Sequence, residues 1–181
     1  MYQKLFELLK TKGVQFDKGL SVKEIDIIEK EYHINFTDEL KQMYKVALPI
    51  SHGFYNWRDQ SINNVAMIKN VMKSPMFEVL DEIDDVEWCE KWGQEPKEKS
   101  ERQYIIKELL SEAPKLIPLR GHRYLASLND EPNPVLSICG LDIIYYGECL
   151  SSYLEIEFKL KSRSNMKYEN INSVPFWSDL L

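Results

Sequence analysis

Apolar side chains recur every three to four positions in the first third of the chain, the spacing of helices that bury one face. The first such run covers residues 2–12 and stops at Gly13, a residue type that commonly follows a helix. A second run covers residues 22–32. It is preceded by Ser21, which together with Glu24 forms the capping box that pairs the first free backbone N–H groups of a helix.

A third helix is expected to begin after Thr37, a residue that caps helices, and to run up to Pro49. Residues 14–16, between the first two helices, fit either a short strand or an extended linker. Residues 51–61 read as a loop with an aromatic middle.

Two further helices are predicted in the middle of the chain. Residues 62–72 have helical spacing, and we expect Pro75 to interrupt that helix because proline lacks a backbone N–H. The other helix is expected to begin with Ser100 as its cap and to end near Pro114. If the acidic stretch between them is helical, Trp88 and Trp92 lie on one face, because they are four residues apart.

The pattern changes to short strand-like runs from Leu116 onward. The runs are LIPL, RYLASL, VLSIC and, between two glycines, LDIIYY; a turn cluster at residues 129–134 separates the second from the third. Residues 151–160 return to helical spacing, and the apolar residues 174–181 are expected to dock on the core. Helices followed by strands and one more helix predict an α+β fold, with residues 1–181 as a single domain.

Composition sets the broad class of the protein. The chain has 181 residues, of which 44% are hydrophobic, enough for a sizeable core. No apolar run reaches the roughly 18–20 residues of a membrane span, and the charged amphipathic N-terminus is unlike a signal peptide. Three cysteines without framework spacing suit a reducing cytoplasm. The net charge of −6 argues against direct binding of nucleic acid.

The negative charge is concentrated in residues 78–101. This segment contains ten acidic and three basic residues, a net charge of −7, so the remainder of the chain is close to neutral. Such a surface can associate quickly with a basic partner, and Trp88 and Trp92 would add desolvated contacts. The alternative is that both tryptophans belong to the core and the carboxylates only solvate a helix.

Motifs for catalysis or metal binding are missing. His33, His52 and His122 are far apart in sequence, and Cys139 and Cys149 have no partner at metal-binding spacing, so no metal and no cofactor are expected. A nucleophilic Cys139 with His122 is formally possible, but a strand cysteine between apolar neighbours is more often a core residue. Carboxylates at 81–87 could imitate a glycosidase pair, although a solvated face is the commoner reason for such a run. We therefore expect a protein without enzymatic activity.

Two other clusters of polar and aromatic residues stand out. In the first, Trp57, Arg58 and Asp59 follow two aromatic residues; this suits a loop pinned to the core or, less readily, a binding surface. In the second, Arg120 and His122 lie between two predicted strands. They could contact a carboxylate of a partner or one within the protein, and the internal contact is slightly favoured.

Several short pieces occur in a recognisable order: residues 54–59 (FYNWRD), 92–93 (WG), 121–124 (GHRY), 133–137 (NPVLS) and 142–147 (DIIYYG). Their order and spacing resemble the SUKH superfamily, which includes Smi/Knr-like fungal cell-wall regulators and many bacterial proteins. The resemblance extends from about Leu20 to Leu180. It departs locally at Thr37, Ala126 and Leu141, where family members often carry proline, proline and a polar residue.

The resemblance implies a curved, mostly antiparallel or mixed sheet surrounded by helices. The bacterial branch further implies a cytoplasmic, non-enzymatic immunity protein that binds the C-terminal toxin domain of a polymorphic toxin, often a nuclease. The alternative is a regulatory protein-interaction module of the Smi/Knr type, linked to cell-wall synthesis or signalling. The two differ in their flanks, since a regulatory scaffold would be expected to carry long disordered segments and this chain has almost none.

Combining the charged and aromatic segments gives one set of candidates for contact with a protein partner. They are Trp57, Arg58, Asp81, Glu82, Asp84, Asp85, Glu87, Trp88, Trp92, Arg120 and His122.

Overall fold

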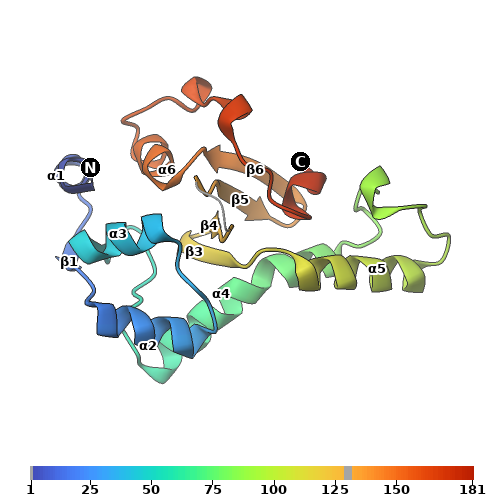
Figure 1. The fold of residues 1–181 in the computed structure, drawn as a ribbon, viewed down its shortest axis with the longest axis horizontal. Coiled ribbons are helices and arrows are strands. Elements are labelled where there is room, and N and C mark those ends of the chain that lie inside the picture. The colour runs from blue at the N-terminus through green and yellow to red at the C-terminus, as the bar shows by residue number, and fades with distance from the viewer. Residues whose placement is uncertain (1, 129–131) are drawn as a thin grey trace.

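The computed structural model describes residues 2–128 and 132–181 (Figure 1). The first three positions of the turn cluster predicted at 129–134 therefore lie outside the described residues. The α-helices are α1 (Tyr2–Thr11), α2 (Val22–Tyr32), α3 (Asp38–Val46), α4 (Ile62–Asp81), α5 (Lys99–Glu112) and α6 (Leu150–Glu157). The 3₁₀ helices are η1 (Glu90–Trp92), η2 (Arg163–Asn165), η3 (Tyr168–Asn170) and η4 (Trp177–Leu180).

Four strands form an antiparallel sheet in which each strand pairs with the next one in the chain. They are β3 (Leu116–Arg120), β4 (Arg123–Ala126), β5 (Val135–Cys139) and β6 (Asp142–Gly147). The register shifts between Pro118 and Arg120, which places a bulge at the end of β3. The strand-rich quarter of the sequence is thus the sheet, and the predicted α+β class is confirmed.

Both faces of this sheet are buried. Alternate strand residues point to opposite faces, so Ile117 and Leu125 join one apolar cluster with α1–α3, whereas Tyr124 and Leu136 join a second cluster with α5 and the C-terminal segment. Helix α4 contributes to both clusters, and Figure 1 shows it running beneath the sheet from the N-terminal helices toward α5.

The N-terminal helices begin where their caps predict. The Ser21–Glu24 capping box is present, and the Thr37 hydroxyl accepts the backbone N–H of Leu40. Residues 14–16 were expected to form either a short strand or an extended linker. The structure has a strand here, but it begins only at Phe16. Strand β1 (Phe16–Lys18) pairs antiparallel with β2 (Ala47–Pro49). The predicted third helix therefore ends earlier than Pro49 because its last residues form β2.

Helix α4 is 20 residues long and continues through Pro75, so the predicted interruption is wrong. Pro75 removes the N–H that would bond the carbonyl of Val71 four residues earlier. The hydroxyl of Tyr124 on β4 donates to this carbonyl oxygen at 3.3 Å. A residue far away in the sequence therefore replaces the missing donor.

The acidic stretch after α4 is not an α-helix. Trp88 and Trp92 therefore do not share the face of a helix, as they would have done if this stretch were helical. Residues 82–98 form turns, extended backbone and η1. Helix α5 then starts at Lys99, with Glu98 at its N-cap and Ser100 inside the helix, so the predicted Ser100 cap is also wrong.

The C-terminal residues dock as expected. Val174, Phe176 and Trp177 are buried in the second apolar cluster. Phe176 has a φ of 67° and a ψ of −58°, and the N–H of Trp177 bonds the carbonyl of Pro175 at 2.9 Å, which together make a γ-turn with positive φ. This turn places Phe176 against Trp92, with ring centroids 5.5 Å apart and planes 14° from parallel.

Candidate functional site

Trp57, one of the predicted partner contacts, is fully buried. Its ring meets Tyr32 and Phe36 edge-on, with centroid distances of 5.1 and 5.2 Å. The pinned-loop interpretation is the one that the structure supports. Trp57 therefore contributes nothing to an exposed binding surface.

Arg58 is occupied by internal partners. Its guanidinium donates to the carboxylates of Glu24 (2.8 Å) and Asp17 (2.6 Å) and to the carbonyls of Lys18 (2.9 Å) and Gly19 (3.0 Å). The hydrogen bond from Arg58 is the largest of several that hold the pKa of Glu24 at about 2. Arg58 thus joins the loop to the start of α2, which is a structural task.

The loop that contains Trp57 also runs beside the sheet. Phe54 forms an isolated antiparallel bridge with Arg120, and the backbone N–H of Tyr55 bonds the carbonyl of Leu119 at 3.4 Å. Arg120 makes an ion pair with Glu157 on α6, so the internal carboxylate contact is the one observed. His122 is exposed in the turn between β3 and β4.

Cys139 is exposed at the end of β5, so its interpretation as a core residue is wrong. The turn to β6 follows it directly, and the strand's buried positions end one residue earlier, at Ile138.

The remaining candidates meet on one surface, here called the acidic surface and formed by residues 81–92 with η4. Arg102 of α5 holds its backbone in place. The guanidinium donates to the carbonyls of Ile83 (3.1 Å) and Val86 and to the carboxylate of Glu95. It also lies over the ring of Trp88, 5.2 Å from a ring centroid. One largely buried arginine therefore shapes a segment that has little regular structure of its own.

The two tryptophans of this surface pack against each other and against the C-terminal segment. Trp88 meets Trp92 edge-on with centroids 5.4 Å apart, and its indole N–H donates to the carbonyl of Gly93 at 2.9 Å. Trp92 donates to Asp179 of η4 at 3.1 Å. Both indoles are partly exposed, so they belong to the edge of the core and also to the surface.

Asp179 also connects η4 to residues 81–92 through an ion pair. Its other carboxylate oxygen lies 2.5 Å from the ammonium of Lys91. This hydrogen bond raises the pKa of Lys91, because the charged ammonium is the form that donates it.

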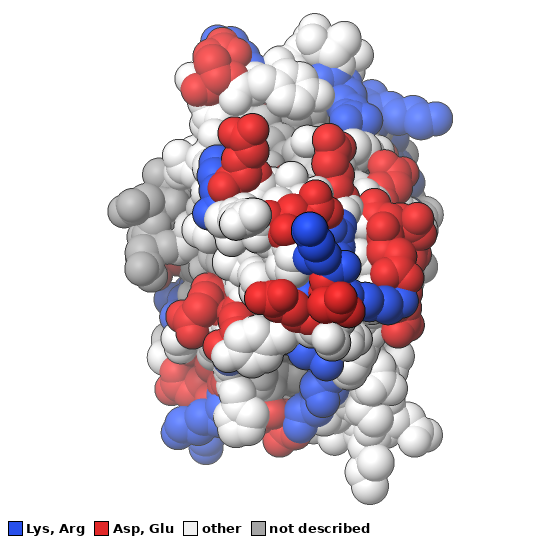
Figure 2. Space-filling model, turned by 90° about the vertical axis from the view of Figure 1, so that its right-hand side faces the viewer, with Lys and Arg blue, Asp and Glu red and all other residues white. Residues whose placement is uncertain are grey.

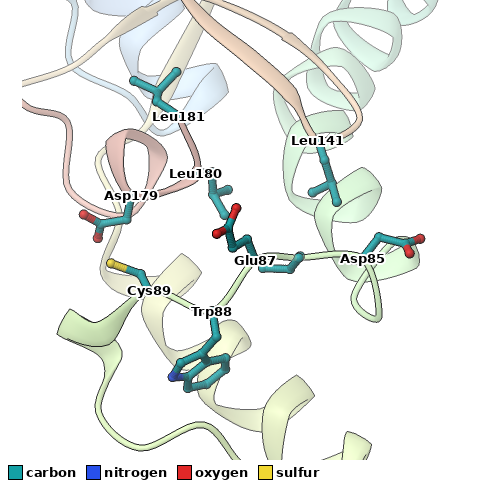
Figure 3. Close-up of a pocket in the computed structure, with 9 residues that line it drawn as sticks. Asp85, Glu87, Trp88, Cys89, Leu141, Asp179, Leu180 and Leu181 are labelled. Carbon is teal, nitrogen blue, oxygen red and sulfur yellow. The ribbon is translucent and has the colours of Figure 1, made fainter.

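A pocket of about 390 Å³ opens between the acidic segment and η4 (Figure 3). Figure 3 shows Asp179 on one side of it and Asp85 on the other, while the indole of Trp88 extends toward α5. The lining residues are Asp85, Val86, Glu87, Trp88, Cys89, Leu141, Asp179, Leu180 and Leu181. Three carboxylates and several apolar groups thus border the same hollow.

The acidic residues of this region differ in whether their carboxylates form hydrogen bonds or ion pairs within the protein. Glu82 accepts the backbone N–H of Leu141 at 3.3 Å, and Asp84 pairs with Lys99. Within the described part of the chain, no hydrogen bond or ion pair engages the carboxylates of three exposed residues, namely Asp81, Asp85 and Glu87. Figure 2 views this end of the molecule, where acidic side chains predominate over basic ones.

Across residues 2–128 and 132–181, no three His, Cys, Asp or Glu side chains are grouped so that they could hold a metal ion. Over the same residues, none of the helices has the length and apolar character needed to span a bilayer.

Two residues that organise the acidic surface were missed by sequence reasoning, Arg102 and Asp179. Their contacts with Val86 and Trp92 join positions 16 and 87 residues apart. The expected docking of residues 174–181 was the one signal that placed Asp179 near the core. In comparisons with known proteins, no family model, no curated protein and no solved structure matches this chain.

Proposed function

We propose that this chain is a cytoplasmic, non-enzymatic immunity protein of the SUKH type that binds and blocks a toxin domain of the nuclease class. The observation that carries the proposal is the acidic surface, where three exposed carboxylates form no hydrogen bond or ion pair with another residue that the structure describes and two of them, Asp85 and Glu87, line a pocket together with the partly exposed Trp88. Nucleases bind phosphate through basic clefts, so a fixed acidic surface can occupy such a cleft.

The arrangement suits protein recognition in two respects. Long-range attraction by Asp81, Asp85 and Glu87 would speed encounter with a basic partner. The half-buried Trp88 would then supply apolar area that is desolvated in the complex. Because Arg102 and η4 already hold the segment in place, little conformational entropy would be lost on binding.

The first test is rescue. The C-terminal domain of a secreted protein encoded beside this gene is co-expressed with this chain, and survival of the host is scored. Protection together with a stable complex on size-exclusion chromatography is expected. Absence of both would overturn the proposal.

The second test locates the interface. The triple variant Asp81→Asn, Asp85→Asn, Glu87→Gln should slow association with the toxin domain about tenfold or more at low salt and flatten its salt dependence. The matched control neutralises three exposed carboxylates elsewhere, with Asp26→Asn, Glu112→Gln and Glu169→Gln. Stopped-flow association rates that fall equally in both triples would show that net charge, rather than this surface, steers the encounter.

A further inference from the structure

A second cavity, of about 430 Å³, lies away from the acidic surface. Three elements form it: the C-terminal end of α2, the middle of α4 and the approach to β3. Its lining residues are Tyr32, His33, Lys69, Met72, Lys73, Lys115 and Leu116. None of these residues lines the pocket on the acidic surface.

The floor of this cavity is apolar. Tyr32 and Leu116 are each only 5% exposed, and Met72 is partly buried against the first apolar cluster. A tyrosine side chain is uncharged at neutral pH, and burial raises the pKa of Tyr32 further, to about 12. An apolar or aromatic group placed on this floor would therefore be removed from water.

The rim of the same cavity is cationic, although the chain as a whole has a net charge of −6. Lys69 and Lys73 are one helical turn apart on α4 and share a face, and Lys115 joins them from the segment that leads into β3. Exposed His33, at the C-cap of α2, adds ring nitrogens that can donate a hydrogen bond.

The charges of the three lysines are not equally compensated. Lys69 pairs with Glu31 at 2.6 Å. Lys115 donates to the carbonyl of His33, a neutral group that leaves the ammonium charge uncompensated. Lys73 has no hydrogen bond or ion pair with any described residue. Two ammonium charges therefore remain available, which matches the roughly −1.5 to −2 charge of a phosphate monoester near pH 7.

We propose that this cavity binds an organic phosphate monoester, with its apolar group on Tyr32, Met72 and Leu116 and its phosphate between Lys73 and Lys115. The site is independent of the acidic surface and goes beyond the immunity function. It would give the protein a small-molecule ligand that the proposed toxin interface does not require.

The test uses phenyl phosphate as probe and two-dimensional ¹H–¹⁵N NMR of the full chain at low salt. Phenyl phosphate at millimolar concentration should shift the amide signals of the lining residues saturably. Inorganic phosphate lacks the apolar group and phenol lacks the charge, so each should bind several-fold more weakly. A nucleoside monophosphate is a second probe, with a larger group attached to the phosphate. If it binds more weakly than phenyl phosphate, the cavity accepts only a small apolar group.

Substitutions then test the cationic rim and the apolar floor of the cavity separately. Lys73→Gln and Lys115→Gln should each weaken phenyl phosphate binding by about tenfold, the size of one charge-assisted hydrogen bond. Lys107→Gln on α5 changes the net charge equally without touching the cavity and should have no such effect. Met72→Ala should weaken binding of phenyl phosphate but not of inorganic phosphate.

Three results would overturn the proposal: no saturable shifts, equal losses in Lys73→Gln and Lys107→Gln, or inorganic phosphate binding as tightly as phenyl phosphate. Well-dispersed spectra of each variant would show that the fold is intact. Failure here would leave the toxin-binding experiments unaffected, because the two sites share no lining residue.

Discussion

The hydroxyl of Tyr124 shows how a single side chain can make a local sequence signal misleading. It donates to the carbonyl of Val71, the acceptor that Pro75 leaves without its helical partner. A tyrosine hydroxyl is protonated at neutral pH and can donate, and burial raises the pKa of Tyr124 further. A proline that would otherwise disrupt a helix is thereby accommodated in its interior.

We expect Tyr124→Phe to lower the free energy of unfolding by about 1 kcal/mol, because the Val71 carbonyl then lacks a donor. In a Pro75→Ala background the new backbone N–H can bond that carbonyl, so the same substitution should cost less. Urea unfolding of the four proteins in this double-mutant cycle measures the difference. Equal costs in both backgrounds would contradict the exchange of donors.

At the scale of elements, the acidic segment between α4 and α5 owes its shape to contacts with its neighbours. It has little helical hydrogen bonding of its own, and its backbone is fixed by Arg102 at one side and by η4 at the other. A lysine in place of Arg102 would keep the charge. A single ammonium group cannot, however, serve two carbonyls, a carboxylate and the face of an indole.

Arg102→Lys should therefore speed amide hydrogen exchange in residues 83–95 by more than tenfold, a local loss of at least about 1.4 kcal/mol. Exchange in the interior of α4 should stay unchanged. The matched control Lys99→Gln removes only the exposed pair with Asp84 and should have little effect. Acceleration spread over the whole chain, or none in this segment, would refute the role of Arg102.

At the scale of the whole molecule, the sheet separates two apolar clusters that α4 connects. The tryptophans divide accordingly. Trp57 is fully enclosed in the first cluster, whereas Trp88 lies at the edge of the second and keeps part of its surface in water. One therefore serves the fold, and the other is available to a partner.

Trp57→Ala should reduce the free energy of unfolding by about 3–5 kcal/mol, as expected for a large cavity in a core. Trp88→Ala should cost only about 1–2 kcal/mol, because much of its area is already hydrated. Chemical unfolding followed by circular dichroism measures both. Similar losses in the two variants would mean that Trp88 is as much a core residue as Trp57.

Features that depend on residues close together in the sequence could be predicted, whereas features that depend on distant residues could not. The Ser21–Glu24 capping box is local and was found, as were the strand runs after Leu116. The β1–β2 pair and the passage of α4 through Pro75 depend on partners far away in sequence, and no local pattern reveals them.

The same holds for the candidate site. Clustered carboxylates and the pair Trp88 and Trp92 were visible in the sequence. Their division into engaged and unengaged groups, and the anchoring by Arg102 and Asp179, required the fold. For Trp57 the sequence favoured a loop pinned to the core over a binding surface, and its full burial confirms that preference.

The loop at residues 53–55 has one more consequence. By bridging Arg120 and Leu119, it covers the last residues of β3, where the edge of the sheet would otherwise offer its backbone to another chain. Trp57, buried just beyond, keeps the loop there. The burial that removes this tryptophan from recognition thus also shields the end of β3 from strand addition, the first step toward aggregation in a crowded cell.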